Sequence, residues 1–438
     1  MIFAREIPTP PDPLAIARAL LASGRRGVAL LHAAEPAPEL LDLGRFSYVA
    51  AEPDRRSAHL DPLADDPELS PTAGPLATIP RWMGVVPYEG CRAIERGARD
   101  ARPRSRMATP IWLRYPAVVR VDHHAGRVIA AGADLRAVER LAAALRDASS
   151  PAEPRLAISV DDAEPAAHHA ERIAAARELI ARGDLYQVNL ARRLRVHLRE
   201  GDPFALYRAL VRRAPTPFGA CLHLEDGIAV ASTSPELLLR ATPGSTPASF
   251  RALFTAPIKG TRPRGADAPA DALLACALEE DPKERAELTM ILDVERNDLG
   301  RVAEVGSVRV LWGPKVVTHR TVHHRLALIA ARARAGTSRE EVLAAMLPSG
   351  SVTGAPKVRA MDVIAALEPA RRGLYTGGIG FVAHDGGVTL SMAIRTSVLE
   401  GSEGEYWTGG GIVADSDPAR EVEETRWKAL QLLGAAGG

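Results

Sequence analysis

The chain has 438 residues, of which 46% are hydrophobic and 25% are charged. This composition is typical of a globular protein with one large core or two smaller ones, and it excludes disordered and fibrous classes. The 55 basic and 54 acidic residues give a formal net charge of +1, so no global field favours nucleic acid or an anionic membrane. We therefore expect neither nucleic acid nor a membrane as a partner.

The N-terminal segment 1–11 is charged and rich in proline, and it lacks the apolar stretch of a signal peptide. No run of about eighteen uncharged apolar residues occurs anywhere in the chain. Its three cysteines, Cys91, Cys221 and Cys276, are far apart and odd in number, which favours reduced thiols over disulfides or a metal cluster. We expect a cytoplasmic protein.

The first clear element is an amphipathic helix over 134–147, with Leu135, Val138, Leu141 and Leu145 on one stripe. A cluster of serine and proline follows at 149–154, and it indicates a boundary there. We expect an N-terminal region over 1–150 and a second region over 160–434, both within one compact body.

Helices and strands alternate beyond this boundary. The pattern predicts helices over 167–182 and 203–213, a strand over 185–198, and two hairpins, one formed by 218–224 with 228–232 and one by 378–383 with 388–398. Hairpins between helices favour an α+β fold with a large antiparallel β-sheet system. No GxGxxG motif follows a strand, so a dinucleotide site is unsupported.

The segment Pro257–Gly265, PIKGTRPRG, is the most informative in the chain. Prolines and glycines predict an irregular loop on which Lys259 and two arginines converge to present an amine to an anion. A polar surface turn is the alternative. Glycine-rich or proline-interrupted blocks recur at 349–357, 375–380 and 409–413, which suggests that several backbone segments close around one ligand.

Two pairs of carboxylates have helical spacing. Glu284 and Glu287 lie in a helix predicted over 283–299, and Glu421 and Glu424 lie in another that Asp417 and Pro418 open. Oxygen ligands without His or Cys favour a hard ion such as Mg²⁺, whereas the same spacing is also common on a solvated helix face.

Two further segments have helix-end signals. The tract 293–301, DVERNDLGR, is typical of a charged helix end with an Asn/Asp and Gly C-cap, a structural role. Pro356 suits the first turn of a helix reaching Leu367, where a ligand carboxylate would gain both the helix dipole and the charge of Lys357.

Taken in order, these motifs closely resemble those of the chorismate-binding enzymes, which include anthranilate synthase component I, aminodeoxychorismate synthase component I, and the isochorismate and salicylate synthases. The resemblance rests on nine blocks: STSPE at 232–236, PIKGTRPRG at 257–265, AELTMILDVERNDLGR at 286–301, TVHH at 321–324, SVTGAPKVRAM at 351–361, YTGGIGF at 375–381, AIRT at 393–396, GGGIVADSDP at 409–418 and EVEETRWK at 421–428. It implies a chorismate-utilising fold of two stacked antiparallel sheets flanked by helices.

The resemblance also implies roles for individual residues. Mg²⁺ would be held by Glu287 and Glu424, supported by Glu284 and Glu421, and would bridge to the ring carboxylate of chorismate. Glu236 matches the acid or base near the C4 hydroxyl, and His324 matches a site histidine. Residues that match substrate-binding positions are Thr261, Thr353, Tyr375, Arg395, Lys428, Gln187 and the backbone of Gly409, Gly410 and Gly411.

Two positions select the reaction that the resemblance implies. Gln187 stands where isochorismate and salicylate synthases carry a lysine that activates water, so water attack at C2 is disfavoured. Lys259 stands where anthranilate synthases typically have alanine and aminodeoxychorismate synthases have lysine. We therefore expect a covalent Lys259 adduct at C2 and amination at C4 to 4-amino-4-deoxychorismate, toward 4-aminobenzoate and folate.

Ammonia would come from a separate glutamine amidotransferase subunit, because the chain shows no module of that kind. Two alternatives remain: an anthranilate synthase that tolerates Lys259, and a silent scaffold that merely positions an amidotransferase. Lys259 itself could instead form a plain ion pair.

The N-terminal region resembles the family only at 30–33 and 44–48. In feedback-regulated anthranilate synthases the first block has an acidic residue and a serine that help to bind tryptophan, whereas His32 and Ala33 stand here. We therefore expect no inhibition by tryptophan. Phe46 and Tyr48 have the period of two that is typical of strand core residues.

Overall fold

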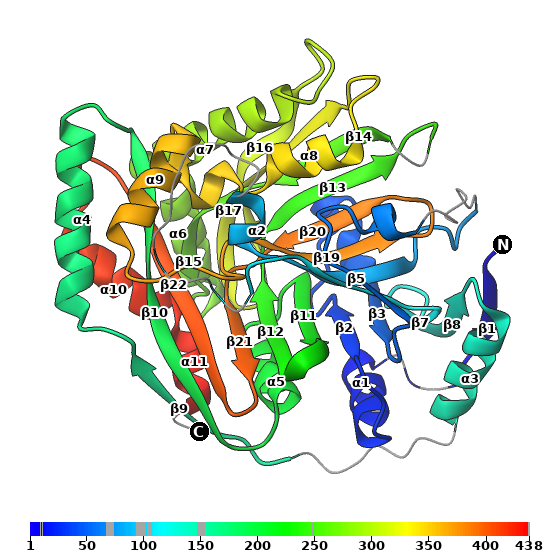
Figure 1. The fold of residues 1–438 in the computed structure, drawn as a ribbon. Helices are drawn as coiled ribbons and strands as arrows, with labels where there is room; N and C mark the ends of the chain where they lie inside the picture. The colour runs from blue at the N-terminus through cyan, green and yellow to red at the C-terminus, as the bar shows by residue number, and fades with distance from the viewer. Residues whose placement is uncertain are drawn as a thin grey trace.

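The computed structural model describes residues 1–438 except 9, 11, 67–73, 93–101, 103–104, 106, 147–153, 247–248 and 437–438. Two stacked β-sheets form the centre of the molecule, and helices cover their outer faces (Figure 1). Neighbouring strands in the described part are antiparallel throughout, because hairpins and returning connections link them. The α+β class and the two stacked sheets predicted from the sequence are confirmed.

The first sheet has twelve strands among the described residues. In spatial order these are β1 (Phe3–Glu6), β8 (Arg127–Gly132), β7 (Ala117–Asp122), β3 (Phe46–Ala50), β2 (Ala29–His32), β11 (Phe218–His223), β12 (Ile228–Ser234), β21 (Thr396–Glu400), β22 (Glu403–Ile412), β10 (Gln187–Glu200) and β18 (Gly354–Ala355), with β9 (Ala157–Asp162) also paired to β10.

The second sheet has ten strands within the same described ranges. Their order is β15 (Ile258–Pro263), β17 (Val322–Arg332), β14 (Phe250–Ala256), β13 (Leu237–Pro243), β20 (Val388–Met392), β19 (Gly378–Ala383), β5 (Pro80–Val86), β6 (Ile111–Arg114) and β4 (Arg55–Ser57), with β16 (Arg309–Thr318) on the other side of β17.

The α-helices pack outside these sheets. They are α1 (Pro13–Ala22), α2 (Tyr88–Arg92), α3 (Leu135–Arg146), α4 (Ala166–Ala181), α5 (Pro203–Arg213), α6 (Ala268–Glu280), α7 (Pro282–Gly300), α8 (Arg339–Met346), α9 (Lys357–Leu367), α10 (Pro418–Lys428) and α11 (Leu430–Ala436).

The core has three layers of apolar contact. Side chains such as Met83 and Ile379 from the second sheet meet Val118 and Leu222 from the first, so one cluster fills the space between the sheets. A second cluster joins the first sheet to α1, α3, α5 and α11, and a third joins the second sheet to α7 and α8. Figure 1 shows α7 and α8 on one side of the molecule and α1 and α5 on the other.

Helix boundaries follow the local signals in the sequence. α3 buries Val138, Leu141 and Leu145 against the first sheet, as its apolar stripe predicts. Asp202 accepts a hydrogen bond from Ala205 N and so caps α5. The predicted helices are confirmed within one or two residues at their ends.

Three local predictions were wrong. The strand predicted over 388–398 is two strands, because the chain turns at Arg395, where φ is 53°, and passes from the second sheet into the first. Gly300 is no left-handed C-cap: α7 includes it, and Arg301 follows in right-handed geometry. PIKGTRPRG is no loop, since β15 occupies Ile258–Pro263 at the end of the sheet.

Both sheets contain strands from the two halves of the sequence. β2 pairs with β11 in the first sheet, and β5 pairs with β19 in the second. Most of the predicted boundary segment at 149–154 lies outside the described residues. No helix of the described part has both the length and the hydropathy needed to span a membrane.

Candidate active site

Lys259 stands on the edge strand β15, which pairs with β17 and shifts register between Ile258 and Thr261. Gly260 permits this irregularity, because its φ of 91° lies in the region that glycine adopts without strain. The Lys259 ammonium makes no hydrogen bond or ion pair with any residue that the structure describes, and its side chain is half-buried. It is therefore available to a ligand.

The neighbouring arginines do not converge on this amine, and that part of the sequence interpretation was wrong. Arg262 turns to Asp281, at 2.9 Å, and to Glu284, at 3.4 Å. Arg264 forms a bidentate pair with Asp271 at 2.7 Å. Carboxylates on α6 and at the start of α7 thus neutralise the two guanidinium groups away from Lys259.

Gln187 and the glycines of β22 meet at Lys259. A methyl group on Gly411 would lie 2.5 Å from Gln187 Nε2 and 3.6 Å from Lys259 Nζ, so only a glycine leaves these side chains in place. Gln187 is fully buried, and neither its amide oxygen nor its nitrogen has a hydrogen-bond partner among the described residues. An unpartnered buried amide is costly unless a ligand or water satisfies it.

Glu236 lies between β12 and β13 and is 5% exposed. Its Oε1 accepts a hydrogen bond of 2.9 Å from Ser351 Oγ. Burial raises the pKa of this carboxyl to about 7, although the hydrogen bond and the charges of Lys259 and Lys428 act in the opposite direction. Glu236 can therefore hold a proton near neutral pH and donate it to a ligand.

His324 and Thr261 face each other across the β15–β17 pair. His324 Nδ1 lies 2.9 Å from Thr261 Oγ1, and the ring is 7% exposed. Burial, followed by the charges of His319 and Arg395, lowers the pKa of His324 to about 3. The imidazole is neutral at physiological pH, so it can donate or accept a hydrogen bond without adding charge.

The four predicted metal ligands lie on α7 and α10 around Lys283. The Lys283 ammonium interacts with all four carboxylates and stands 3.7 Å from Glu287. Lys428 Nζ lies 2.6 Å from Glu424, and this charge is the main cause that lowers the pKa of Glu424. Desolvation raises the pKa of Glu284 and of Glu421, and neighbouring carboxylates add to both shifts.

As they stand, no three His, Cys, Asp or Glu side chains within the described ranges are close enough together to hold a metal ion. The chemistry of the donors nevertheless fits a hard divalent cation: carboxylates from two helices repel one another, and lysines balance them. Helical spacing alone could not predict that the carboxylates on α7 would lie beside those on α10.

The remaining predicted ligand contacts occupy one neighbourhood. Arg395 donates from Nη1 to the Lys428 carbonyl at 2.9 Å, and Lys428 Nζ donates to the Gly409 carbonyl at 2.8 Å. The Tyr375 ring is stacked on Trp407, with centroids 6.0 Å apart. Thr353 is buried, and its hydroxyl donates to the Ser349 carbonyl at 2.8 Å.

Lys357 is not available as the anion-binding charge predicted at the start of α9. Its ammonium is nearly buried, lies 2.7 Å from Asp298 and donates to the Ala345 carbonyl. Asp298 belongs to the tract that was interpreted as a helix end, so this pair ties α7 to α9. The start of α9 therefore has a structural role.

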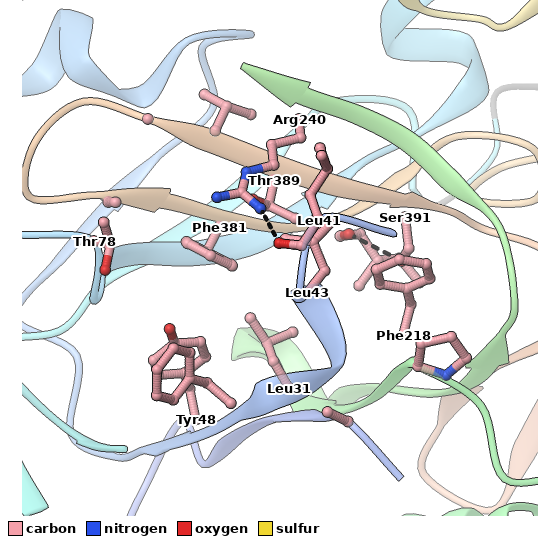
Figure 2. A pocket seen from close by; sticks show the side chains of 18 of the residues that line it. Leu31, Leu41, Leu43, Tyr48, Thr78, Phe218, Arg240, Phe381, Thr389 and Ser391 are labelled. Atoms are coloured by element: carbon pink, nitrogen blue, oxygen red, sulfur yellow. Dashed lines mark hydrogen bonds between the residues drawn. The ribbon is translucent and has the colours of Figure 1, made fainter. Parts of the chain in front are cut away.

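A separate apolar cavity of about 270 Å³ lies between the sheets near β2 and β3. Figure 2 shows Leu31 and Tyr48 on one wall and Arg240 on the other, where Arg240 donates to the Leu41 carbonyl at 2.9 Å. Phe46 and Tyr48 line this cavity, a role that their strand period did not indicate. His32 also lines it, with Nδ1 2.9 Å from Tyr207 Oη.

Comparison with known proteins places this geometry in a family. Residues 29–434 match the family model described as chorismate binding enzyme. The chain is 36% identical to anthranilate synthase component 1 of Streptomyces coelicolor over 433 residues, which covers 92% of this chain and 82% of that protein. It is 45% identical to aminodeoxychorismate synthase component 1 of Klebsiella aerogenes over 253 residues, or 57% of this chain and 54% of that protein.

A solved structure of a similar protein has the same overall fold. The crystal structure of anthranilate synthase component I from Streptococcus pneumoniae superposes with a TM-score of 0.75 at 28% identity, covering 88% of this chain and 91% of that one. The family model spans both sheets except β1. The chain therefore belongs to the chorismate-binding enzyme family.

Proposed function

We propose that this protein aminates chorismate at C4 with ammonia to give 4-amino-4-deoxychorismate, through a covalent Lys259 intermediate. The observation that carries the proposal is the Lys259 amine beside Gln187 and Gly411, without a hydrogen bond or ion pair in the described part of the chain. A lysine that served only as a structural ion pair would have a carboxylate within salt-bridge distance, whereas Lys259 acts on Glu236 and Glu424 only through its longer-range charge. Relatives named aminodeoxychorismate synthase agree with this reaction.

Glu236 and Lys259 would act on opposite ends of one allylic displacement. Once the Lys259 ammonium has lost a proton to solvent, its amine forms a bond to C2 while the C4–O bond breaks, and Glu236 gives its proton to the departing hydroxyl, which leaves as water. Ammonia then bonds to C4 while the C2–N bond breaks, and that electron pair returns to Lys259. The positive charge carried by the lysine adduct thus passes to the new C4 ammonium group.

The other residues would position the ring. Arg395 supplies positive charge for a substrate carboxylate, and Lys428 would supply it once Mg²⁺ takes the place of its ammonium at Glu424. The Gly409–Gly411 backbone carries no side chains and so leaves room for the ring. Mg²⁺ held by Glu287 and Glu424, with Glu284 and Glu421 in support, would neutralise a substrate carboxylate when bound. Neutral His324 adds a hydrogen bond without repelling the cationic adduct.

We infer that ammonia comes from a separate glutamine amidotransferase subunit. The relatives from Streptomyces coelicolor and Klebsiella aerogenes are both named component 1, which indicates a second component. Free ammonium at high concentration should replace that subunit in an assay of the purified chain.

A second candidate is anthranilate synthase activity, with amination at C2. It is favoured by the Streptomyces coelicolor relative, whose match covers 92% of this chain. In that case Lys259 would leave C2 open to ammonia. A catalytically silent scaffold is a third possibility, and it predicts no consumption of chorismate at all.

The substitution Lys259→Ala tests the proposal. We expect wild type with chorismate, Mg²⁺ and ammonium to place nitrogen at C4, as read by product mass and NMR. The variant should lose turnover by at least about tenfold, or make anthranilate, because the C2 nucleophile is gone. Lys315→Ala removes an exposed lysine that lies over the Trp312 ring on β16, and it should leave the rate unchanged. Unchanged C4 amination by Lys259→Ala would exclude the covalent route.

A further inference from the structure

Glu236 is connected to a second buried acid through two serine hydroxyls. Ser351 Oγ lies 2.9 Å from Glu236 Oε1 and 2.9 Å from Ser349 Oγ. Ser349 Oγ is in turn hydrogen bonded to Oε1 of Glu295, which α7 carries into the interior with 1% of its surface exposed. The result is a linear chain of a carboxyl, two hydroxyls and a carboxyl.

The hydrogen bonds of this chain determine how many protons it holds. Three hydrogen bonds join its four groups, and each bond needs one proton. The two hydroxyls supply two, so the third must come from a carboxyl. Either Glu236 is protonated and the donors point toward Glu295, or Glu295 is protonated and they point toward Glu236. Two ionised carboxylates would leave one of the three bonds without a proton.

The surroundings of both acids favour one retained proton. Burial raises the pKa of Glu295 to about 7, and the charges of Asp298 and Glu236 add to that shift, whereas Lys357 on α9 opposes it. Glu236 has a pKa raised to about the same value, with Lys259 and Lys428 opposing. Two carboxyls with similar proton affinities titrate as a pair and exchange a proton at little cost.

We propose that Glu236 and Glu295 share a single proton, and that Glu295 is a positioning residue: after Glu236 has given that proton to the C4 hydroxyl, Glu295 takes up a new proton from solvent and returns it to Glu236. Glu295 passes its proton to Ser349, Ser349 passes its own to Ser351, and Ser351 passes its own to Glu236. No bond other than O–H changes. This inference rests on the proposed role of Glu236 as the acid at C4.

Solvent can approach Glu295 from a groove beside α7. A groove of about 960 Å³ runs along α7 and the start of α9, and Asp298 and Lys357 line it. Asp298 is one helical turn from Glu295 and shares a face with it. Glu295 Oε2 and Asp298 Oδ2 are both buried without a hydrogen-bond partner in the described structure, so water between them would find acceptors on both sides.

The test is Glu295→Gln, which keeps the size of the side chain but cannot release a proton. We expect kcat for chorismate consumption at pH 8 to fall at least tenfold, with KM within twofold. The pH at which kcat falls to half should move lower, because Glu236 loses the neighbouring negative charge that helps it to retain a proton. Glu340→Gln, the same substitution at an exposed acid on α8 that does not line this groove, should change neither value.

A second variant separates proton transfer from charge. Ser349→Ala interrupts the chain but keeps both acids, and it should lower kcat in the same pH range. The double variant, Glu295→Gln with Ser349→Ala, should be no slower than the slower single variant, because both substitutions interrupt the same proton pathway. The proposal is overturned if the Glu295→Gln enzyme keeps kcat within twofold of wild type and has an unchanged pH profile. It is also overturned if the losses of kcat in the two single variants multiply in the double variant. If Glu295→Gln fails to fold, the pH profile of Ser349→Ala decides alone.

The experiment distinguishes failure of the proton chain from failure of the proposed function. Amination at C2 and at C4 both expel the C4 hydroxyl, so chorismate consumption reports on the proton chain in either case. The position of nitrogen in the wild-type product reports on the proposed function alone.

Discussion

The fold raises the pKa of Glu236 by burying its carboxyl group. The carboxyl has a pKa of about 7 in the folded protein, against an ordinary value of 4.5. The folded state therefore binds this proton more tightly than the unfolded state does. Between pH 4.5 and 7 the protein loses stability as the pH rises, by roughly 1.4 kcal/mol for each pH unit, because the buried group must ionise.

Replacing Glu236 by Gln should abolish turnover and yet stabilise the protein above pH 7. Glutamine never ionises, so the variant should gain about 3 kcal/mol relative to wild type at pH 8 and little at pH 4.5. Urea unfolding at both pH values measures the difference. A stability change of the same size at both pH values would show that ionisation of Glu236 is not its cause.

Sequence motifs located the reacting residues but not their partners. Lys259, Glu236 and Gln187 were identified by resemblance, and the structure brings all three to one neighbourhood. Glu295 was missed, because a glutamate in an amphipathic helix has the same appearance whether it faces solvent or a buried serine. Only the fold brings Ser349 and Ser351 to it.

The glycine at the end of α7 permits a direct test of the helix boundary. Gly300 lies inside the helix and is exposed, and a methyl group there would contact nothing within 4 Å. Gly300→Ala should therefore stabilise the protein by about 0.5 to 1 kcal/mol, because alanine loses less backbone entropy in a helix. Thermal unfolding measures this. A destabilised variant would favour the C-cap interpretation of this residue that the sequence suggested.

Helices and strands were predicted well where the hydrophobic periodicity extended over many residues. They were predicted poorly where a single residue changes the direction of the chain. The alternation over 388–398 continues through Arg395, and nothing in it marks the change from one sheet to the other. PIKGTRPRG looked irregular because of its prolines. At the end of a sheet a strand needs hydrogen bonds on one side only, so β15 can end at Pro263 without losing a partner.

The whole molecule depends on strand pairing between distant parts of the sequence. Without residues 1–150, β11 would lose β2, and β19 would lose β5. A fragment of residues 160–434 should then expose two strand edges and the apolar cluster between the sheets, and it should aggregate. Size-exclusion chromatography and hydrogen exchange measure this. A monomeric fragment with cooperative unfolding would show that the second region folds alone.

The arrangement of the whole molecule was the least predictable from sequence. Composition and hairpins indicated α+β, and the resemblance implied stacked sheets. The order of strands brings β2 beside β11 through contacts nearly two hundred residues apart, and local patterns contain no such information. The cavity lined by Phe46 and Tyr48 arises from the same packing.

The glycines at 409–411 in β22 have a practical consequence for redesign. A methyl group on Gly409 would lie 2.5 Å from the Leu190 carbonyl oxygen, and one on Gly411 would displace the Gln187 amide. Libraries meant to broaden the choice of ring or nucleophile should therefore leave these three glycines unchanged.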